Sequence, residues 1–379
     1  MTEPEIPAAV YVDNPELLEQ IVDELRQAPA LAIDTESNSL HAYQEQVCLI
    51  QISTREHDFL VDSLALTDLG SLGSIFADTN TQKVFHAGDY DLTCLKRDYA
   101  FRFENVFDTM LAASALGEES LGLAGLVEKY LGVCIDKKYQ RADWGKRPIK
   151  MEMLRYAQMD SHYLLDLRDC LVPKLEELRR LELVLEDSAA LASQTPAMKN
   201  HAEDFWRVKG LNGMKPPALS LLKQLNHLRE SLAKSQNLPP FKIMSDAALV
   251  EIANTQPHFL EELDLLPSLS AGQVRRYGKE LMRVVEQWRK APGKVSRTRT
   301  QGPDDAVLRR RELLGEWRKQ NGLKQGLPSN VILPRDLLEK IAQAEVKDLE
   351  ALRGLMLGSP SRFEMYGDAI FELLREEHT

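Results

Sequence analysis

The chain has 379 residues, of which 44% are hydrophobic and 28% are charged, as in an ordinary globular protein of two or three domains. No apolar stretch approaches the roughly 18 residues that a membrane span needs. The segment from Met1 to Pro7 lacks the basic and apolar regions of a signal peptide, so we expect a cytoplasmic protein without membrane contact. The formal net charge of −11 argues against a protein that coats nucleic acid non-specifically.

Basic residues and cysteines are distributed unevenly along the chain. The segments Lys137–Lys150 and Arg289–Arg299 are locally basic, and each is either a phosphate-binding surface or merely a solvated face or linker. The four cysteines are far apart, without metal-ligand spacing, and each has apolar neighbours. They are expected to be reduced thiols buried in the core: Cys48, Cys94, Cys134 and Cys170.

Strand patterns dominate the sequence between residues 30 and 86. Apolar, β-branched runs separated by short polar segments predict three strands in an antiparallel meander, at Ala30–Glu36, Val47–Ser53 and Asp58–Val61. A helix is expected from about Leu66 to Phe76. Lys83–His86 predicts another strand.

From Tyr90 onward the hydrophobic period is helical. Asp108 and Thr109 are expected to cap the start of one helix. A long helical stretch from about Lys150 to Ala192 is expected to break at Pro173. Strands followed by helices predict an α/β domain over residues 1–195, with a mixed β-sheet flanked by helices.

Beyond this domain the sequence becomes helical and repeats itself. Five apolar positions recur as the same residue types 89 positions later, and an offset held so consistently predicts two copies of one all-helical module. The modules are expected at 205–290 and 304–376, joined by a linker at Lys290–Pro303. The pairs are Leu238 and Leu327, Ile243 and Ile332, Leu249 and Leu338, Ile252 and Ile341, and Tyr277 and Tyr366.

Two carboxylates, Asp34 and Glu36, end the first predicted strand. Residues i and i+2 of a strand lie on the same face, so both side chains point the same way. Like charges side by side repel unless a cation lies between them, and clusters of carboxylates suit Mg²⁺ or Mn²⁺. The alternative is that both acids belong to a turn that closes the strand.

Further acids that could complete such a cluster occur at two places. Asp91 follows the strand Lys83–His86 at the edge where ligand sites of open α/β sheets lie, while its neighbour Asp89 could simply cap the next helix. Tyr156 and Asp160 are four residues apart and therefore share one face of a helix. The alternative for this pair is an ordinary amphipathic helix with a half-buried tyrosine and a solvated acid.

In chain order, the candidate acids and the neighbouring His86 and Tyr156 form the motifs Asp-x-Glu, His-x4-Asp and Tyr-x3-Asp. This order resembles the DEDD exonuclease superfamily, in the branch with Tyr before the last Asp, and more closely the ribonuclease D family, over Leu31 to about Leu171. The helical repeats resemble the HRDC module, present twice. The matching segments are Leu49–Ile52, Leu60–Asp62, Lys83–His86, Phe107–Thr109, Asp143-Trp144 with Arg147-Pro148, and Tyr156–Leu165.

The resemblance implies a fold and an activity. The first domain would be an RNase H-like exonuclease that trims the 3′ trailers of tRNA precursors and other small structured RNAs, releasing nucleoside 5′-monophosphates. RNA would be the partner, and no protein partner is implied. Asp34, Glu36, Asp91 and Asp160 would hold two divalent metal ions, Mg²⁺ or Mn²⁺. Tyr156 would orient the attacking water, because a phenol with a pKa of about 10 is a poor base at neutral pH.

The resemblance also implies contacts with the substrate. Thr35, His86, Trp144 and Arg147 are expected to bind RNA, although Trp144 could instead pack in the core and Arg147 could form a structural ion pair. Ser37 stands where the family commonly has an aromatic residue that packs on the 3′-terminal nucleotide, and a serine side chain offers no ring for this stacking contact.

Two rival functions differ in substrate or in class. A DNA exonuclease of the same superfamily would need the same four acids, because acids that contact phosphate and metal do not sense a 2′-hydroxyl. A catalytically inactive scaffold would bind RNA through the helical repeats alone. The presence of all four acids and Tyr156 argues against the scaffold.

Overall fold

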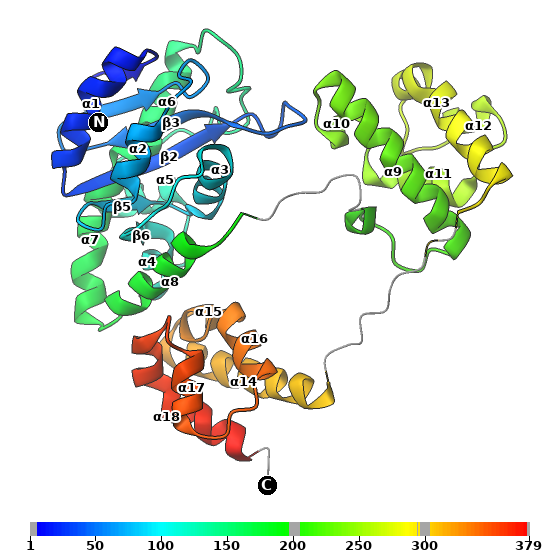
Figure 1. The fold of residues 1–379 in the computed structure, drawn as a ribbon. Coiled ribbons are helices and arrows are strands. Elements are labelled where there is room, and N and C mark those ends of the chain that lie inside the picture. Colours follow the sequence, from blue (N-terminus) through cyan, green and yellow to red (C-terminus); the bar gives the residue numbers. More distant parts are fainter. Residues whose placement is uncertain (1–5, 197–204, 294, 296–303, 377–379) are drawn as a thin grey trace. The chain divides into compact units, whose positions relative to one another are not determined.

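The computed structural model describes residues 6–196, 205–293, 295 and 304–376 (Figure 1). Most of the predicted linker at Lys290–Pro303 lies outside these ranges. The chain divides into two compact units, one formed by Met1–Glu36, Val47–Pro196 and Gln301–Thr379 and the other by Ser37–Gln46 with Ala197–Thr300. Among the described helices, none combines the length and apolar character that crossing a bilayer requires.

A six-stranded sheet forms the centre of the first unit, with strand order β1-β4-β3-β2-β5-β6. Strands β3 and β4 are antiparallel, whereas β1 runs parallel to β4, β2 to β5, and β5 to β6. The predicted mixed sheet is therefore confirmed. The bounds are β1 Val10–Val12, β2 Ala30–Ser37, β3 Val47–Ser53, β4 Asp58–Val61, β5 Gln82–Phe85 and β6 Val106–Asp108.

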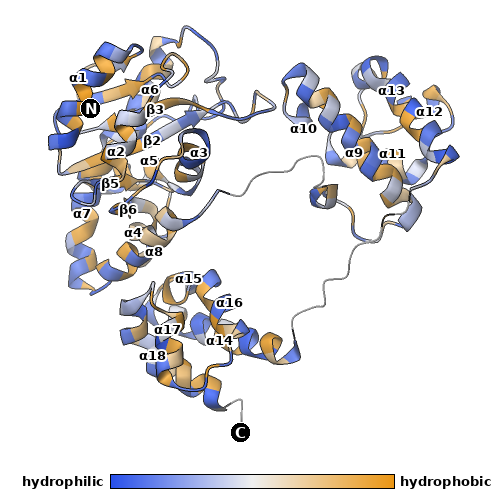
Figure 2. Cartoon of the chain, viewed as in Figure 1, coloured by the Kyte–Doolittle hydropathy of each residue, from blue (hydrophilic) through white to orange (hydrophobic). Residues whose placement is uncertain are grey.

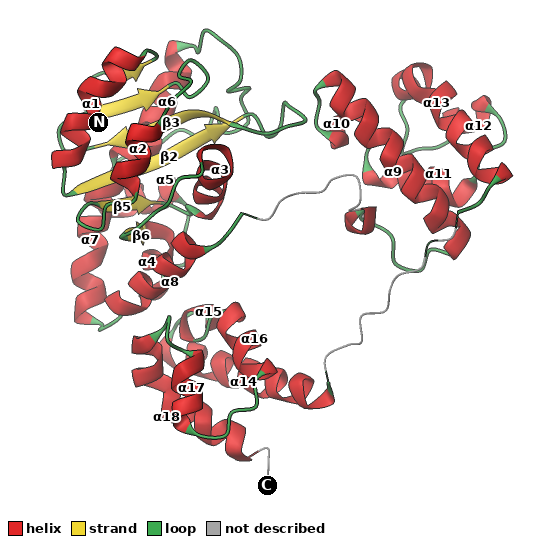
Figure 3. Cartoon of the chain, in the orientation of Figure 1, coloured by secondary structure: helices red, strands yellow, loops and turns green. Residues whose placement is uncertain are grey.

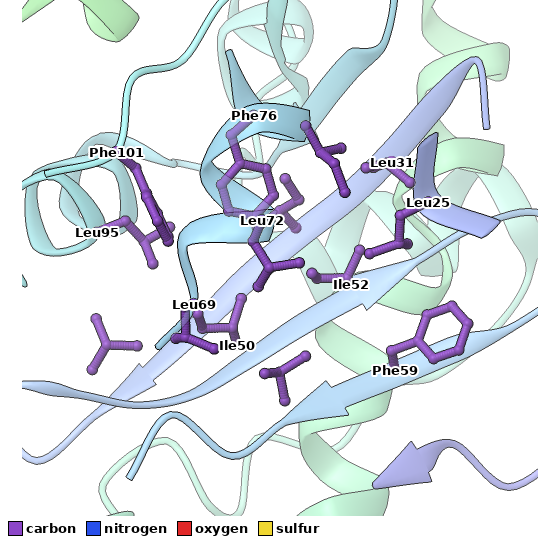
Figure 4. Close-up of a cluster of buried hydrophobic side chains, with 14 of the residues drawn as sticks. Leu25, Leu31, Ile50, Ile52, Phe59, Leu69, Leu72, Phe76, Leu95 and Phe101 are labelled. Carbon is purple, nitrogen blue, oxygen red and sulfur yellow. The ribbon is translucent and has the colours of Figure 1, made fainter. Parts of the chain in front are cut away.

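Strand β2 is buried on both faces, and its side chains alternate between two cores. Leu31 and Ile33 belong to the core that includes α1, α2 and α3, part of which Figure 4 shows around Leu72 and Phe76. Ala30 and Ala32 belong to the core on the other face. The same alternation continued along β2 assigns Asp34 and Glu36 to the face of Ala30 and Ala32.

Helices cover the sheet (Figure 3). Asp108 caps α4 as predicted, because its carboxylate accepts hydrogen bonds from the backbone N–H groups of Met110 (2.8 Å) and Leu111 (3.1 Å). The bounds are α1 Pro15–Gln27, α2 Gly70–Phe76, α3 Asp89–Tyr99, α4 Thr109–Leu116, α5 Leu123–Leu131, α6 Met151–His162, α7 Leu164–Glu177 and α8 Leu181–Ser193.

Three predictions about local structure were wrong. Helix α2 begins at Gly70 rather than near Leu66. Pro173 lies inside α7, where the burial of Leu171 and Leu175 on either side favours a continuous helix despite the missing N–H. Cys134 is exposed, because its neighbours Val133 and Ile135, rather than the cysteine, pack against the core. Cys48 and Cys94 are buried as expected, whereas Cys170 is only partly buried.

The two helical modules have matching helices. Each helix of the second module begins 89 residues after its counterpart in the first. Apolar (orange) and polar (blue) stretches alternate along these helices, as expected of helices that bury one face (Figure 2). The first module has α9 Pro216–Gln236, α10 Pro240–Ile243, α11 Asp246–Thr255, α12 Leu260–Asp264 and α13 Ala271–Lys290. The second has α14 Asp305–Gln325, α15 Ser329–Ile332, α16 Arg335–Gln343, α17 Leu349–Leu355 and α18 Pro360–Glu376.

The second module packs on the exonuclease-like domain within the first unit. The guanidinium of Arg362 on α18 is fully buried and donates to Glu186 (3.0 Å) and Asp187 (2.7 Å) on α8. At the same contact Gly117 has a φ of +81°, and a Cβ there would lie 2.8 Å from the carbonyl oxygen of Gly326, so only glycine fits. The contact ties the second module to the sheet domain, while the proposed boundary at residue 304 stays a prediction.

The second compact unit contains the first module and the short segment Ser37–Gln46. The hydroxyl of Tyr43 donates to Glu230 on α9 (3.1 Å), and its backbone N–H donates to Asn237 (3.2 Å). Leu221, Leu225 and Leu281 lie in the buried core of this unit.

Candidate active site

Four acids from three elements interact at the sheet face that carries Asp34 and Glu36. Burial raises the pKa of the Asp34 carboxyl well above its usual range, and the charges of Asp91, Asp160 and Glu36 raise it further. Burial and the charges of Asp160 and Asp91 likewise raise the pKa of Glu36. The predicted acids of β2, α3 and α6 therefore act on one another electrostatically.

Hydrogen bonds partly offset this effect at two of the acids. Burial raises the pKa of Asp91 to about 6, against a hydrogen bond donated by the hydroxyl of Thr35. Burial and the charge of Asp91 raise the pKa of Asp160 to about 7, against a hydrogen bond donated by the phenol of Tyr156. A cluster of buried acids with raised pKa values is typical of functional sites.

Tyr156 is buried, and its phenol lies beside the acids. Burial and the charges of Asp160, Glu36 and Asp34 raise the pKa of this phenol, so it stays protonated at neutral pH. Tyr139 packs edge-on against its ring (centroids 5.9 Å apart, 71°), and the Trp144 ring lies 6.2 Å away at 34°. The phenol is therefore held in place and is a hydrogen-bond donor rather than a base.

The donor set of these acids fits hard divalent cations. All four residues offer carboxylate oxygens, which Mg²⁺ and Mn²⁺ prefer, and a cation between them would offset the repulsion that raises their pKa values. Among the described residues, no group of three or more His, Cys, Asp or Glu side chains already stands in metal-binding geometry. The acids would therefore adjust their side chains when an ion binds.

The burial of Asp89 and Asp91 agrees with the sequence-based expectation, but the residue that caps helix α3 does not. Asp91 is buried and Asp89 is exposed, but the N-cap of α3 is Gly88 rather than Asp89. The backbone N–H of Gly88 donates to the carboxylate of Asp108 (2.8 Å), and a Cβ on Gly88 would lie 2.6 Å from Phe85. Asp108 thus holds the turn that leads to Asp91, a role that sequence reasoning missed beyond its N-cap signal.

The residues expected to bind substrate have partners within the protein. Thr35 donates to Asp91, and Nδ1 of His86 lies 2.9 Å from the Thr109 hydroxyl, with burial lowering the pKa of the imidazole. Trp144 is 1% exposed and packs in the core near Tyr156. These contacts favour supporting roles, and direct contact of these residues with RNA stays a prediction.

Arg147 forms the structural ion pair that was one of its two alternatives. Its guanidinium donates two hydrogen bonds of 2.6 Å to the carboxylate of Asp62, and others to the carbonyl oxygens of Trp144 (2.7 Å) and Cys48 (2.8 Å). Burial alone would raise the pKa of Asp62, but hydrogen bonds from Arg147 and Tyr11 hold it below its usual range. Arg147 therefore fixes the loop that places Trp144 beside Tyr156.

Comparison with known proteins agrees with this organisation. Residues 9–176 match the model of the 3′-5′ exonuclease family, and residues 218–285 and 307–374 each match the HRDC domain. The chain therefore belongs to the class of proteins in which a 3′-5′ exonuclease domain is followed by two HRDC domains. Ribonuclease D of Gluconacetobacter diazotrophicus is 31% identical over 268 residues, which cover 70% of this chain and 68% of that protein. The chain belongs to the ribonuclease D family, as its sequence resemblance predicted.

Two other relatives extend the comparison. The exosome complex exonuclease RRP6 of Saccharomyces cerevisiae is 32% identical over 292 residues, or 73% of this chain. The chain spans 40% of the length of that protein, and less than half of the length of the two RRP6-like proteins of Arabidopsis thaliana and of the exosome complex component 10 homologs of Caenorhabditis elegans and Drosophila melanogaster. The crystal structure of Escherichia coli RNase D shares the fold, with a TM-score of 0.69 at 23% identity over 98% of this chain and 99% of that one. The predicted fold class is confirmed.

Proposed function

We propose that this chain is a metal-dependent 3′-5′ exoribonuclease that trims the 3′ trailers of tRNA precursors and other small structured RNAs. The observation that carries the proposal is the cluster of four acids, each with a raised pKa, beside a protonated Tyr156. Membership of the ribonuclease D family supports RNA as the substrate class.

Divalent metal dependence is a property of the exonuclease family that this domain matches. Asp34, Glu36, Asp91 and Asp160 would hold two ions, Mg²⁺ or Mn²⁺. When bound, such ions supply Lewis-acid chemistry, which acidifies water and offsets charge on the reacting phosphate. The protein supplies a buried set of carboxylates whose mutual repulsion favours cation binding.

In the proposed reaction, water attacks the phosphorus of the last phosphodiester, and the bond from that phosphorus to the 3′ oxygen of the preceding nucleotide breaks. The terminal nucleotide leaves as a nucleoside 5′-monophosphate, and the 3′ oxygen takes up a proton. Tyr156 stays protonated and can orient the attacking water while donating to Asp160. Trp144 and Tyr139 fix the direction of its phenol.

The test compares substrates and metal conditions directly. The full chain is incubated with 3′-extended tRNA and with single-stranded DNA of matched length, with Mg²⁺ or with chelator. We expect stepwise shortening of the RNA from its 3′ end only with Mg²⁺. Preferred degradation of DNA, or degradation in chelator, would contradict the proposal.

Two controls sharpen this test. The Asp91→Asn variant should lose activity, whereas Asp89→Asn changes an exposed acid only two residues away and should keep it. Circular RNA should survive, because an exonuclease needs a free 3′ end. Cleavage of the circle would identify an endonuclease instead.

A further inference from the structure

The last helices of the two HRDC modules carry opposite charges at corresponding positions. On α13, Arg275, Lys279 and Arg283 are exposed and spaced four residues apart, so they form a stripe along one face. The corresponding residues of α18 lie 89 positions further along and are all acidic and exposed: Glu364, Asp368 and Glu372. At each of these three positions, the charge of the side chain has opposite sign in the two modules.

The comparison is valid because the two helices face their cores in the same way. Leu281 of α13 and its counterpart Ile370 of α18 are both fully buried, and Val285 and Leu374 are buried likewise. The charge reversal therefore affects the same solvent face of the same helix. It is not the result of a rotated helix.

An exposed aromatic residue lies beside the basic stripe. An open pocket of about 480 Å³ is lined by Phe259, Lys279 and Arg283, together with the acids Glu261 and Glu286. Phe259 is 66% exposed. The first module thus presents an aromatic ring next to cations, which is the combination that binds unpaired bases and their phosphates.

Phe259 also occupies a position where local structure favours a different residue. It is the N-cap of α12 and supplies no side-chain cap, whereas its counterpart Asp348 caps α17 by accepting from the N–H of Ala351 (2.7 Å). The first module therefore forgoes a stabilising cap and exposes an aromatic ring instead. Local stability does not explain why an exposed phenylalanine occupies this position, whereas ligand binding does.

The second module uses α18 for a different contact. Arg362 of α18 is buried against Glu186 and Asp187 of the exonuclease domain. Its counterpart in the first module is Gln273, which completes a capping box with Ser270. The acidic face of α18 would repel phosphates, so this face is suited to solvent.

We infer that the face of α13 formed by Arg275, Lys279 and Arg283, together with Phe259, is an RNA-binding surface, and that the matching face of α18 is not. The inference deepens the proposed function and rests on RNA being the substrate. The three cations contact backbone phosphates, and Phe259 stacks on an unpaired base. The two HRDC domains thus have different roles, since the first binds RNA and the second packs against the exonuclease domain.

The experiment measures RNA binding apart from cleavage. Binding of 3′-extended tRNA to the full chain is measured in chelator at two salt concentrations for a variant with Arg275→Gln, Lys279→Gln and Arg283→Gln. We expect binding about tenfold or more weaker at low salt, and a slope of log affinity against log salt that is shallower by about 2 to 3. Unchanged RNA affinity, which a protein-binding face would give, overturns the inference.

The matched control neutralises the opposite helix. A variant with Glu364→Gln, Asp368→Asn and Glu372→Gln should bind RNA as well as the wild type or slightly better. Weakening equal to that of the α13 variant overturns the assignment. Degradation of a short oligonucleotide by the wild type in Mg²⁺ tests the exonuclease proposal separately, so failure of that proposal and failure of the binding proposal are distinguishable.

Phe259→Asp separates stacking from stability. This change places the cap residue of the second module at the same position, so the melting temperature should hold or rise. Affinity for an RNA with a single-stranded tail should nevertheless fall about tenfold or more, because one stacking platform is lost and the new carboxylate repels phosphates. Unchanged affinity removes Phe259 from the proposed surface.

Discussion

The hydroxyl of Thr35 donates a hydrogen bond to the carboxylate of Asp91, and this bond joins the strand that bears two of the acids to the helix that bears a third. Thr35 stands between Asp34 and Glu36 in the sequence. One short segment of β2 therefore supplies two carboxylates and also positions another. The bond opposes the burial that raises the pKa of Asp91.

Replacing Thr35 by valine should show how much this bond contributes. Thr35→Val keeps the shape of the side chain but removes the hydroxyl donor, so the buried carboxylate of Asp91 retains only its backbone hydrogen bonds. A hydrogen bond to a charged group is worth about 1.5–3 kcal/mol, so we expect kcat to fall by about 10-fold to 100-fold. Thr35→Ser retains the hydroxyl and should stay close to wild type. Equal losses in both variants would point to packing instead.

The pH dependence of stability should reveal the acid cluster in the metal-free protein. The folded-state pKa of Asp160, about 7, lies above its value in the unfolded chain. Its contribution to stability is therefore fully present at low pH and is lost as the pH rises through about 7. We expect the free energy of unfolding by urea in chelator to fall between about pH 4 and 7, from the unfolded to the folded pKa of Asp160.

Asp160→Asn should make this pH dependence shallower, because the amide does not titrate while the other acids of the cluster still do. The variant should also be at least as stable as the wild type at pH 8, where the repulsion between acids is strongest. Asp89→Asn serves as the matched control and should retain the wild-type slope. A wild-type slope in Asp160→Asn would mean that other groups cause the pH dependence.

Tyr156→Phe tests the phenol as a positioning group. One positioned hydrogen bond in a buried, charged site is worth roughly 2–4 kcal/mol, so kcat should fall about 30-fold to 10³-fold with little change in KM. The rising limb of the pH–rate profile should persist, since the raised pKa of the phenol excludes it as the titrating base near neutrality. Tyr139→Phe keeps the packed ring and should leave kcat within about threefold.

Disappearance of the rising limb in Tyr156→Phe would contradict the positioning role. Such a result would mean that the phenolate itself accepts the proton. A large rise in KM with kcat unchanged would instead assign Tyr156 to substrate binding.

Arg362→Met should loosen the second HRDC domain. The change leaves the buried carboxylate of Glu186 without its partner, and breaking a buried pair in this way costs about 3–5 kcal/mol. The melting temperature of the full chain should fall, and limited proteolysis should cut between the domains sooner. Arg375→Met alters a pair on the same helix that is 66% exposed at the arginine, and it should melt like the wild type.

Local sequence patterns predicted the elements that carry the acids. Strands β2, β3 and β4 were found close to their true bounds, because alternation and β-branched residues mark long buried strands. Strands β1 and β6 were missed, since three residues give too little pattern. Equal spacing also predicted the duplicated module, whose helices begin at matching positions.

Contacts between distant parts of the chain were not predictable in this way. The hydrogen bond from Thr35 to Asp91 was not predicted, because the two residues are 56 positions apart and no local pattern links them, while the expected contact of Thr35 with RNA stays a prediction. The anchor from Arg362 to Glu186 spans 176 residues and was not anticipated at all. Only the folded chain shows which alternative a side chain such as Arg147 adopts.

The equal spacing of helix starts in the two HRDC modules has a consequence for how they diverged. From α9 to α13 and from α14 to α18, no insertion or deletion separates the starts of corresponding helices. The two copies therefore acquired their different surfaces by substitution alone, on a shared backbone plan. The charged residues on the solvent face of one module can therefore be placed at the corresponding positions of the other by substitution. This makes the pair of domains a suitable scaffold for transferring one surface onto the other.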